Sequence, residues 1–157
     1  MITGEIKNRI DQIWDAFWTG GITNSIDVLE QMTYLFFMKM IDDAQIKKEA
    51  TASMFKTNVK NPTFKEGMWH NPDSDKDVPY KDLRWSVFKN FDPDRMFKTV
   101  RENTFAFIKN LDGERESAYS KYMKDAAFKI PNAHVLLKIV DGIEKLDMNN
   151  RDDMGDV

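Results

Sequence analysis

Lysines recur in the stretch from Lys56 to Lys65, where asparagine, proline and threonine separate them. A lysine ammonium group can neutralise a phosphate of a nucleic-acid backbone, so cations along a mobile segment could close on a duplex. Further basic residues follow up to Lys89, but acidic residues are interleaved with them, which is also typical of a solvated surface. We select three lysines as candidate DNA contacts because they cluster in one irregular segment: Lys56, Lys60 and Lys65.

Residues that could carry catalysis or hold a metal do not form a recognisable pattern. The sequence contains no G-x-G-x-x-G, G-x-x-x-x-G-K-[ST], H-E-x-x-H or G-x-S-x-G motif. His70 and His134 lie far apart, and neither has a second ligand at helical spacing. Asp73, Asp75 and Asp77 alternate in "DSDKD" without the glycine and closing glutamate of an EF-hand, which favours a solvated loop. We expect no catalytic, cofactor-binding or metal-binding residue in this chain.

Apolar residues at intervals of three and four predict the helices that must position these side chains. The pattern predicts helices over roughly 4–18, 25–48, 92–111, 114–126 and 133–146. Thr23, Asn24 and Ser25 are each able to cap the second helix, and Asn132 is a candidate cap of the last one. "DPD" at 92–94 has the aspartate and proline typical of a helix start. Gly142 interrupts the last pattern, which is explained either by close packing against another helix or by simple tolerance of the glycine.

The densest apolar run is "MTYLFFMKMIDD" at residues 32–43. Its twelve residues are too few for a membrane span, and apolar residues cover most of the helix circumference. We therefore predict that it forms the centre of the core, and that Phe36→Ala costs about 3–5 kcal/mol. Lys39, Asp42 and Asp43 are expected on the strip that reaches solvent or a partner. The predicted buried face comprises Ile26, Leu29, Met32, Leu35, Phe36, Met40 and Ile46.

Between about residues 50 and 79 the helical periodicity fails, and prolines, asparagines and aspartates predict turns. Phe64, Met68, Trp69 and Tyr80 indicate that parts of this segment dock back onto the core. The predicted fold class is therefore all-α: a bundle of about five or more helices with one long irregular loop at about 50–79. A length of 157 residues favours a single helical domain over 1–157.

Composition excludes several classes of protein. The hydrophobic fraction of 41% is too high for a disordered tail, and the absence of cysteine excludes disulfides and thiolate chemistry. No apolar stretch reaches the roughly 18 residues of a membrane span, and the N-terminus does not have the apolar region of a signal peptide. A cytoplasmic protein without membrane association is expected. The net charge of −3 is not that of a free-standing nucleic-acid binder, which usually has a basic excess.

Two blocks of the sequence carry a resemblance to a known family. They are "IKNRIDQIWDAFWTGGITNSIDVLEQMTYLFFMKMIDD" at 6–43 and "FKIPNAHVLLKIVDGIEKLD" at 128–147. Together with the final "DMGDV", they are similar to the opening of the modification (M) subunit of type I restriction–modification systems. The insert "EGMWHNPDSDKD" at 66–77 departs from that pattern. The matching residues are Ile13, Trp14, Ala16, Leu35, Phe36, Met38, Lys39 and Asp42, then Ile130, Pro131, Asn132, Val135, Leu136, Val140, Asp141, Ile143, Leu146 and Asp147.

The resemblance implies the N-terminal helical domain of a DNA adenine methyltransferase subunit. In that family S-adenosylmethionine and the N-P-P-[FY] motif belong to a following α/β domain, so the chain is expected to be the N-terminal part of a longer polypeptide. This part alone is expected to be inactive and to bind no cofactor. The implied partners are a specificity (S) subunit, a second M subunit, a restriction subunit, and double-stranded DNA in the assembled complex. The domain would assist assembly and close over DNA while an adenine is flipped out for methylation.

Two other interpretations stay open at the level of sequence. One is an independent helical protein-interaction module with no role in DNA binding. The other is a protein that binds single-stranded nucleic acid, in which the bases of the strand stack on Trp14, Trp18 and Trp69. A following N-P-P-[FY] motif would identify the methyltransferase, whereas quenching of tryptophan fluorescence by an oligonucleotide would favour the single-strand binder.

Overall fold

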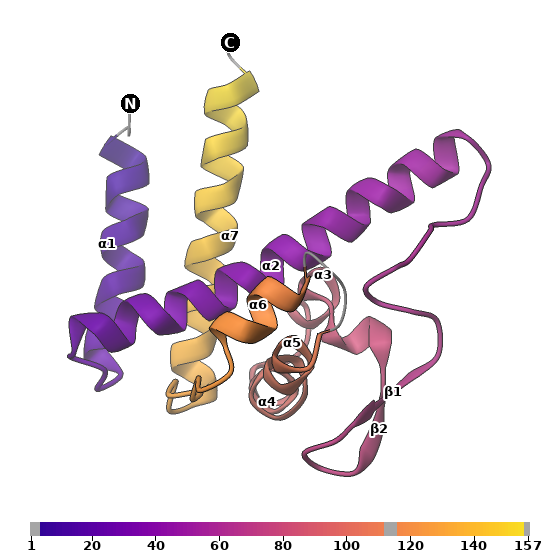
Figure 1. Cartoon of the computed structure of the whole chain (residues 1–157). Helices are drawn as coiled ribbons and strands as arrows, with labels where there is room; N and C mark the ends of the chain where they lie inside the picture. Colours follow the sequence, from indigo (N-terminus) through magenta and orange to yellow (C-terminus); the bar gives the residue numbers. More distant parts are fainter. Residues whose placement is uncertain (1–3, 112–115, 156–157) are drawn as a thin grey trace. The chain divides into compact units, whose positions relative to one another are not determined.

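The computed structural model describes residues 4–111 and 116–155, without the side chains of 116, 117, 119 and 147–155 (Figure 1). This part of the chain is mostly helical, as predicted, and it divides into two compact units. One unit combines the residues up to Met32 with those from Lys129 onward, and the other is Thr33–Phe128. The long helix α2 (Ser25–Met54) begins in the first unit and continues in the second.

In the first unit, α1 (Gly4–Thr19) packs lengthwise against α7 (Ala133–Gly155) (Figure 1). Gly142 permits this contact, because a Cβ atom at that position would lie 2.5 Å from Cγ1 of the buried Ile13. A Cβ atom at Gly20 would similarly lie 2.7 Å from Cγ2 of Val135. Close helix packing, one of the two explanations open at Gly142, is therefore confirmed.

Side-chain caps start the helices where the sequence predicted them. The Oδ1 atom of Asn24 accepts the Ile26 N–H at 2.8 Å at the start of α2. Asp92 accepts the Arg95 N–H at 3.0 Å, and Pro93 occupies the first turn of α4. Asn132 accepts the Val135 N–H at 3.0 Å at the start of α7. Each cap satisfies a backbone donor that the helix itself leaves without a partner.

The second unit is built around the side chain of Phe107. Its ring stacks on Phe64 at a centroid distance of 5.2 Å and meets Trp69 edge-on at 5.3 Å and Tyr80 at 6.1 Å. These three aromatics come from the segment predicted to be irregular, so its predicted docking onto the core is confirmed for them, whereas Met68 is exposed. Besides α2, the elements of this unit are β1 (Met68–Asn71), β2 (Lys76–Pro79), the 3-10 helix η1 (Tyr80–Leu83), α3 (Trp85–Phe88), α4 (Pro93–Thr99), the π turn η2 (Val100–Thr104), α5 (Phe105–Lys109) and α6 (Glu116–Tyr122).

The predicted loop at 50–79 requires correction. The helix α2 continues to Met54, and residues 68–79 form an antiparallel hairpin in which Asn71 pairs with Lys76. The side chain of Asn71 is fully buried and donates to the Glu102 carbonyl at 2.9 Å and to Oδ1 of Asn103 at 3.0 Å. The hairpin is thus held by these polar contacts to η2 and by the ring of Trp69 against Phe107. Its strands have no continuous apolar face, so the sequence shows no alternating pattern there.

The prediction of which residues of α2 are buried was also partly wrong. Phe36 is only half-buried, and Leu35 is fully buried beside it. Lys39 and Asp42 are enclosed rather than on an exposed strip, because Lys39 bonds to Asp43 at 2.8 Å and Asp42 accepts from Arg84. The predicted apolar positions that prove exposed are Ile26, Leu29, Met40 and Ile46.

Candidate nucleic-acid interface

The C-terminal end of α2 and the segment after it carry a concentration of positive charge. Residues 44–65 contain five lysines and a single acidic residue, Glu49, although the whole chain has a net charge of −3. Glu49 is itself bound by the guanidinium of Arg84, at 2.8 and 2.9 Å. Within the described part of the chain, none of the five lysines forms an ion pair. Their charge is therefore available to an anionic ligand.

Three of these lysines line a common hollow of about 450 Å³. Lys47 and Lys48 come from the last turns of α2, and Lys60 comes from the segment that folds back beside them. The remaining lining residues supply hydroxyl and amide groups and a small apolar floor: Thr51, Ala52, Thr57, Asn58 and Val59. Ammonium, hydroxyl and amide donors around one hollow are suited to phosphate oxygens.

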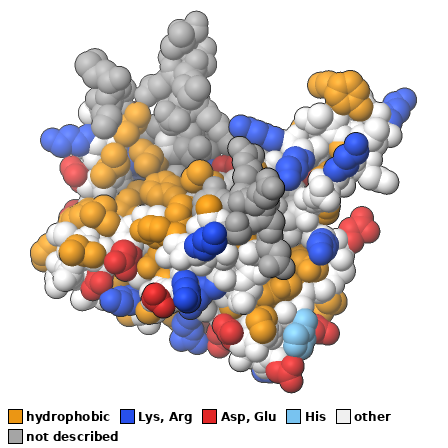
Figure 2. All heavy atoms as spheres, in the orientation of Figure 1, with side chains coloured by type: hydrophobic (Ala, Val, Ile, Leu, Met, Phe, Trp, Pro, Cys, Tyr) orange, Lys and Arg blue, Asp and Glu red, His pale blue; other side chains and the backbone are white. Residues whose placement is uncertain are grey.

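The end of α2 beside this hollow carries two exposed apolar side chains. Met54 is 79% exposed and Phe55 is 69% exposed. Figure 2 shows basic side chains and a hydrophobic one together at the upper right, where Figure 1 places this end of the helix. Lys56 follows with a φ of 52°, a left-handed conformation that glycine usually occupies at the end of a helix.

The structure distributes the three predicted lysines over different surroundings. Lys60 lines the hollow with Lys47 and Lys48, and Lys56 lies in the left-handed turn after α2. Lys65 lines a separate hollow of about 540 Å³. Around this second hollow the acidic Glu49 and Glu66 offset two of the three cations Lys65, Lys81 and Arg84, so only one positive charge remains in excess.

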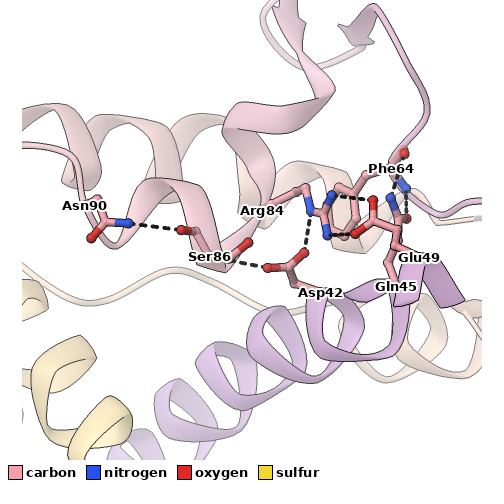
Figure 3. Close-up of polar contacts among 7 residues, drawn as sticks. All are labelled: Asp42, Gln45, Glu49, Phe64, Arg84, Ser86 and Asn90. Carbon is pink, nitrogen blue, oxygen red and sulfur yellow. Dashed lines mark hydrogen bonds and ion pairs between the residues drawn. The ribbon is translucent and has the colours of Figure 1, made fainter. Parts of the chain in front are cut away.

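A partly buried polar cluster borders the second hollow (Figure 3). Nε of Arg84 bonds to Oδ1 of Asp42 at 2.5 Å, and its two terminal nitrogens bond to Glu49. The second oxygen of Asp42 accepts the Ser86 N–H at 2.8 Å. The side-chain amide of Gln45 holds both backbone groups of Phe64, at 2.6 and 2.9 Å. The cluster fixes the segment after α2 to the helix.

Charge pairing in this cluster shifts the pKa of both partners. Hydrogen bonds from Arg84 lower the pKa of Glu49, and hydrogen bonds to Glu49 raise the pKa of Arg84. All of the side-chain nitrogens of Arg84 are engaged by carboxylates, so this cation stabilises the fold and is not available for a phosphate. The lysines of the first hollow, in contrast to Arg84, form no ion pair with a carboxylate among the described residues.

The histidines lie outside both hollows. His70 is exposed on the hairpin, with its two ring nitrogens 2.8 Å from Asp77 and 3.0 Å from Asp75. A hydrogen bond to Asp77 raises the pKa of His70. His134 is exposed in the first turn of α7. Among the described residues no group of three or more acidic or histidine side chains is arranged to hold a metal ion.

The tryptophans offer little surface for stacking. Trp69 is half-buried against Phe107, and Trp14 is half-buried in α1. Trp18 alone of the three is exposed, at 46%. A stacking platform made of these residues receives no support from their burial.

Sequence reasoning missed Lys47, Lys48 and Phe55. The predicted second helix ended near Lys48, so the first two were assigned to its terminus and the third to the loop. The signal that could have found them is the charge of the window 44–65, whose lysine excess contrasts with the acidic balance of the chain.

The family of the chain follows from comparison with known proteins. Residues 6–143 match the model of the HsdM N-terminal domain. The chain belongs to this family. It is thus the N-terminal domain of a methyltransferase subunit of type I restriction–modification systems, as the two sequence blocks predicted. HsdM proteins are adenine methyltransferases that use S-adenosylmethionine.

Two further comparisons, with curated proteins and with solved structures, gave no match. Among the described residues, no helix of this HsdM domain is both long and apolar enough to cross a membrane.

Proposed function

We propose that this HsdM domain assists assembly with the specificity subunit and closes over DNA, so that the following domain can methylate a flipped adenine. The observation that carries the proposal is the family match together with the uncompensated lysines at 44–65. A domain that closes over a duplex already held by other subunits needs only a few phosphate contacts, because tethering raises the effective concentration. A local cluster of cations on an otherwise acidic domain meets this need.

The proposed partners are the specificity subunit, a second M subunit, the restriction subunit and double-stranded DNA in the assembled complex. S-adenosylmethionine and the catalytic residues are assigned to the following domain, and this chain alone is proposed to be inactive. No motif for cofactor binding occurs in the sequence, and the lysine cluster is suited to phosphates rather than to a methyl donor.

Deletion tests this function in the assembled methyltransferase. Removal of the residues matched by the family, 6–143, should abolish methylation of the cognate duplex and reduce the yield of complex with the specificity subunit. Methylation at the wild-type rate by the deleted enzyme would contradict a role in closure. Normal methylation combined with failed assembly would favour a protein-interaction module.

Charge reversal tests the DNA contacts proposed at Lys56, Lys60 and Lys65. In the assembled enzyme the triple glutamate variant should bind DNA more weakly, and the slope of log K against log salt should fall by about 0.9 for each lost phosphate contact. The recognised sequence should stay unchanged, because phosphate contacts carry no base information. An unchanged slope would remove these three lysines from the interface.

A further inference from the structure

The two most exposed large hydrophobic side chains among the described residues are neighbours, Met54 at 79% and Phe55 at 69%. They stand at the point where α2 ends, and the nearest charged residues along the chain on either side are Glu49 and Lys56. Because Glu49 is occupied by Arg84, the surroundings of the apolar pair are positively charged. Exposed apolar surface within a positive field indicates a ligand that is both anionic and flat or apolar.

The backbone holds Phe55 in a defined place. The Thr57 N–H donates to the Ala52 carbonyl at 2.8 Å, and the Lys56 N–H donates to the Ser53 carbonyl at 3.2 Å. With Lys56 in the left-handed conformation, these two bonds form a Schellman motif. Phe55 is the last residue before the left-handed one, and its own N–H bonds to Thr51 at 3.1 Å. The ring is therefore carried by a fixed helix end.

The lysine-lined hollow adjoins this helix end. Ala52 and Thr57, which the Schellman motif connects, both line the hollow. Lys47, Lys48 and Lys60 surround it, and its volume of about 450 Å³ admits a phosphate group with its solvent. The hollow and Phe55 can thus contact successive parts of one strand.

We propose that the C-terminal end of α2 is a nucleic-acid contact in which the hollow takes a backbone phosphate and Phe55 stacks on an unstacked base. Phenylalanine stacks on any base face and also wedges between base steps. The proposal deepens the proposed closure over DNA and rests on it. It assigns a base contact to the domain, whereas lysine contacts alone would touch only the backbone.

The composition of the surface favours nucleic acid over other partners. Lysine is depleted in protein–protein interfaces, yet three lysines line this hollow. Insertion into a membrane surface requires a long amphipathic face, whereas two apolar side chains at a helix end supply little apolar area. A nucleic-acid strand matches both the cations and the ring.

Photo-cross-linking in the assembled enzyme tests the contact of Phe55. Phe55 is replaced by benzoylphenylalanine, and Met68, an exposed apolar residue of the hairpin, is replaced in a control. Irradiation with cognate duplex should cross-link position 55 to DNA several-fold more than position 68. Cross-linking of position 55 to a protein subunit, or equal yields at the two positions, would overturn the proposal.

Substitution of the lysines tests the hollow. In the assembled enzyme, glutamine at Lys47, Lys48 and Lys60 should lower the salt slope of DNA binding by about 0.9, since the three lysines share one phosphate and each neutralised phosphate contributes about 0.9. The matched control replaces Lys7, Lys138 and Lys145, three exposed lysines of α1 and α7, and should leave the slope unchanged. Equal slopes in the two triple variants would contradict a phosphate in the hollow.

The deletion of residues 6–143 distinguishes a failure of the proposed domain function from a failure of the proposed contact at Phe55. If the deletion abolishes methylation but position 55 does not cross-link to DNA, the domain function stands and this contact fails. If the deletion leaves methylation intact, the function itself fails.

Discussion

Two stretches of α2 use the same residue types in opposite ways. In the middle of the helix, Lys39 and Asp42 are enclosed and bonded within the chain. At the C-terminal end, Lys47 and Lys48 are exposed and form no ion pair within the described part of the chain. The difference arises from the partners available to each charge. Arg84 meets Asp42 from another element, and Asp43 lies one turn along α2 from Lys39, whereas Lys47 and Lys48 have no such partner among the described residues.

This contrast teaches that residue type does not decide whether a charge stabilises the fold or serves a ligand. A buried carboxylate is stable only where donors surround it, as Arg84 and the Ser86 N–H surround Asp42. An exposed lysine contributes little to stability and retains its charge for a partner. Mutations in the two stretches should therefore separate stability from binding.

The largest effect is expected from Asp42→Ala. Removal of this carboxylate leaves the guanidinium of Arg84 without one partner in a largely buried site, which should lower the free energy of unfolding by about 3–5 kcal/mol. Urea denaturation measures the change. The control Asp141→Ala removes an exposed carboxylate of α7 and should stay within about 0.5 kcal/mol. Equal losses of unfolding free energy in the two variants would contradict a special stabilising role of the enclosed carboxylate.

Next in size is Leu35→Ala, which should destabilise the chain by about 2–5 kcal/mol because Leu35 is fully buried in the middle of α2. Phe36→Ala should cost less, since the half-buried ring already contacts solvent. Thermal denaturation of the two variants ranks them. A larger loss for Phe36→Ala would restore the core position that the sequence predicted for this ring.

At the helix end, Lys56→Gly should stabilise the fold by about 0.5–1 kcal/mol. Glycine adopts the left-handed conformation without the steric cost that a lysine bears at φ 52°. Lys60→Gly is the control, because Lys60 is not among the residues of positive φ and gains no such relief. Chemical denaturation should show opposite signs for the two glycine variants.

The ion pair of Glu49 should give a small dependence of stability on pH. Arg84 lowers the pKa of Glu49 below 4.5 in the folded state, so its stabilisation is fully present above that unfolded value. The stabilisation is lost as the pH falls through the lowered folded pKa. The difference in Tm between the wild type and Glu49→Gln should therefore be largest near pH 6 and shrink toward about pH 3. A difference that grows on acidification would contradict this sign.

The smallest effect on stability is expected from glutamine at Lys47, Lys48 and Lys60. Their exposed charges have no partner within the described residues, so the free energy of unfolding should change by less than about 0.5 kcal/mol. Urea denaturation provides this measurement on the variant used for DNA binding. A loss near that of Asp42→Ala would show that the lysines serve the fold instead.

The sequence predicted the helices well where local chemistry decided them. The caps Asn24, Asp92 and Asn132 are determined by side chains that bond to the backbone a few residues away. At Gly142 the sequence allowed two explanations, close packing or a tolerated glycine, and the approach of Ile13 decides for close packing. The family itself followed from residues on α1, α2 and α7.

Long-range polar pairing was not predictable from the sequence. The buried face of α2 includes Gln31, Asp42 and Gln45, whose polarity indicated an exposed face. Each is buried because a distant backbone or side-chain group meets it: Lys129, Arg84 and Phe64, respectively. The hairpin was missed for the same reason, since Asn71 anchors it to a helix some thirty residues away. Of the residues around the lysine-lined hollow, Lys60 was among the predicted contacts, whereas Lys47, Lys48 and the neighbouring Phe55 required knowledge of where α2 ends.

The π turn η2 acts as an insertion of one residue in an otherwise continuous helix from α4 to α5. The Glu102 carbonyl in this widened turn accepts a hydrogen bond from the side-chain amide of Asn71 at 2.9 Å. Each residue of an α-helix rotates the side-chain direction by about 100°, so a chain shortened by one residue here would turn Phe107 away from Phe64 and Trp69. One additional residue in this helix thus places the acceptor that holds the hairpin and also orients Phe107 toward the other aromatic rings.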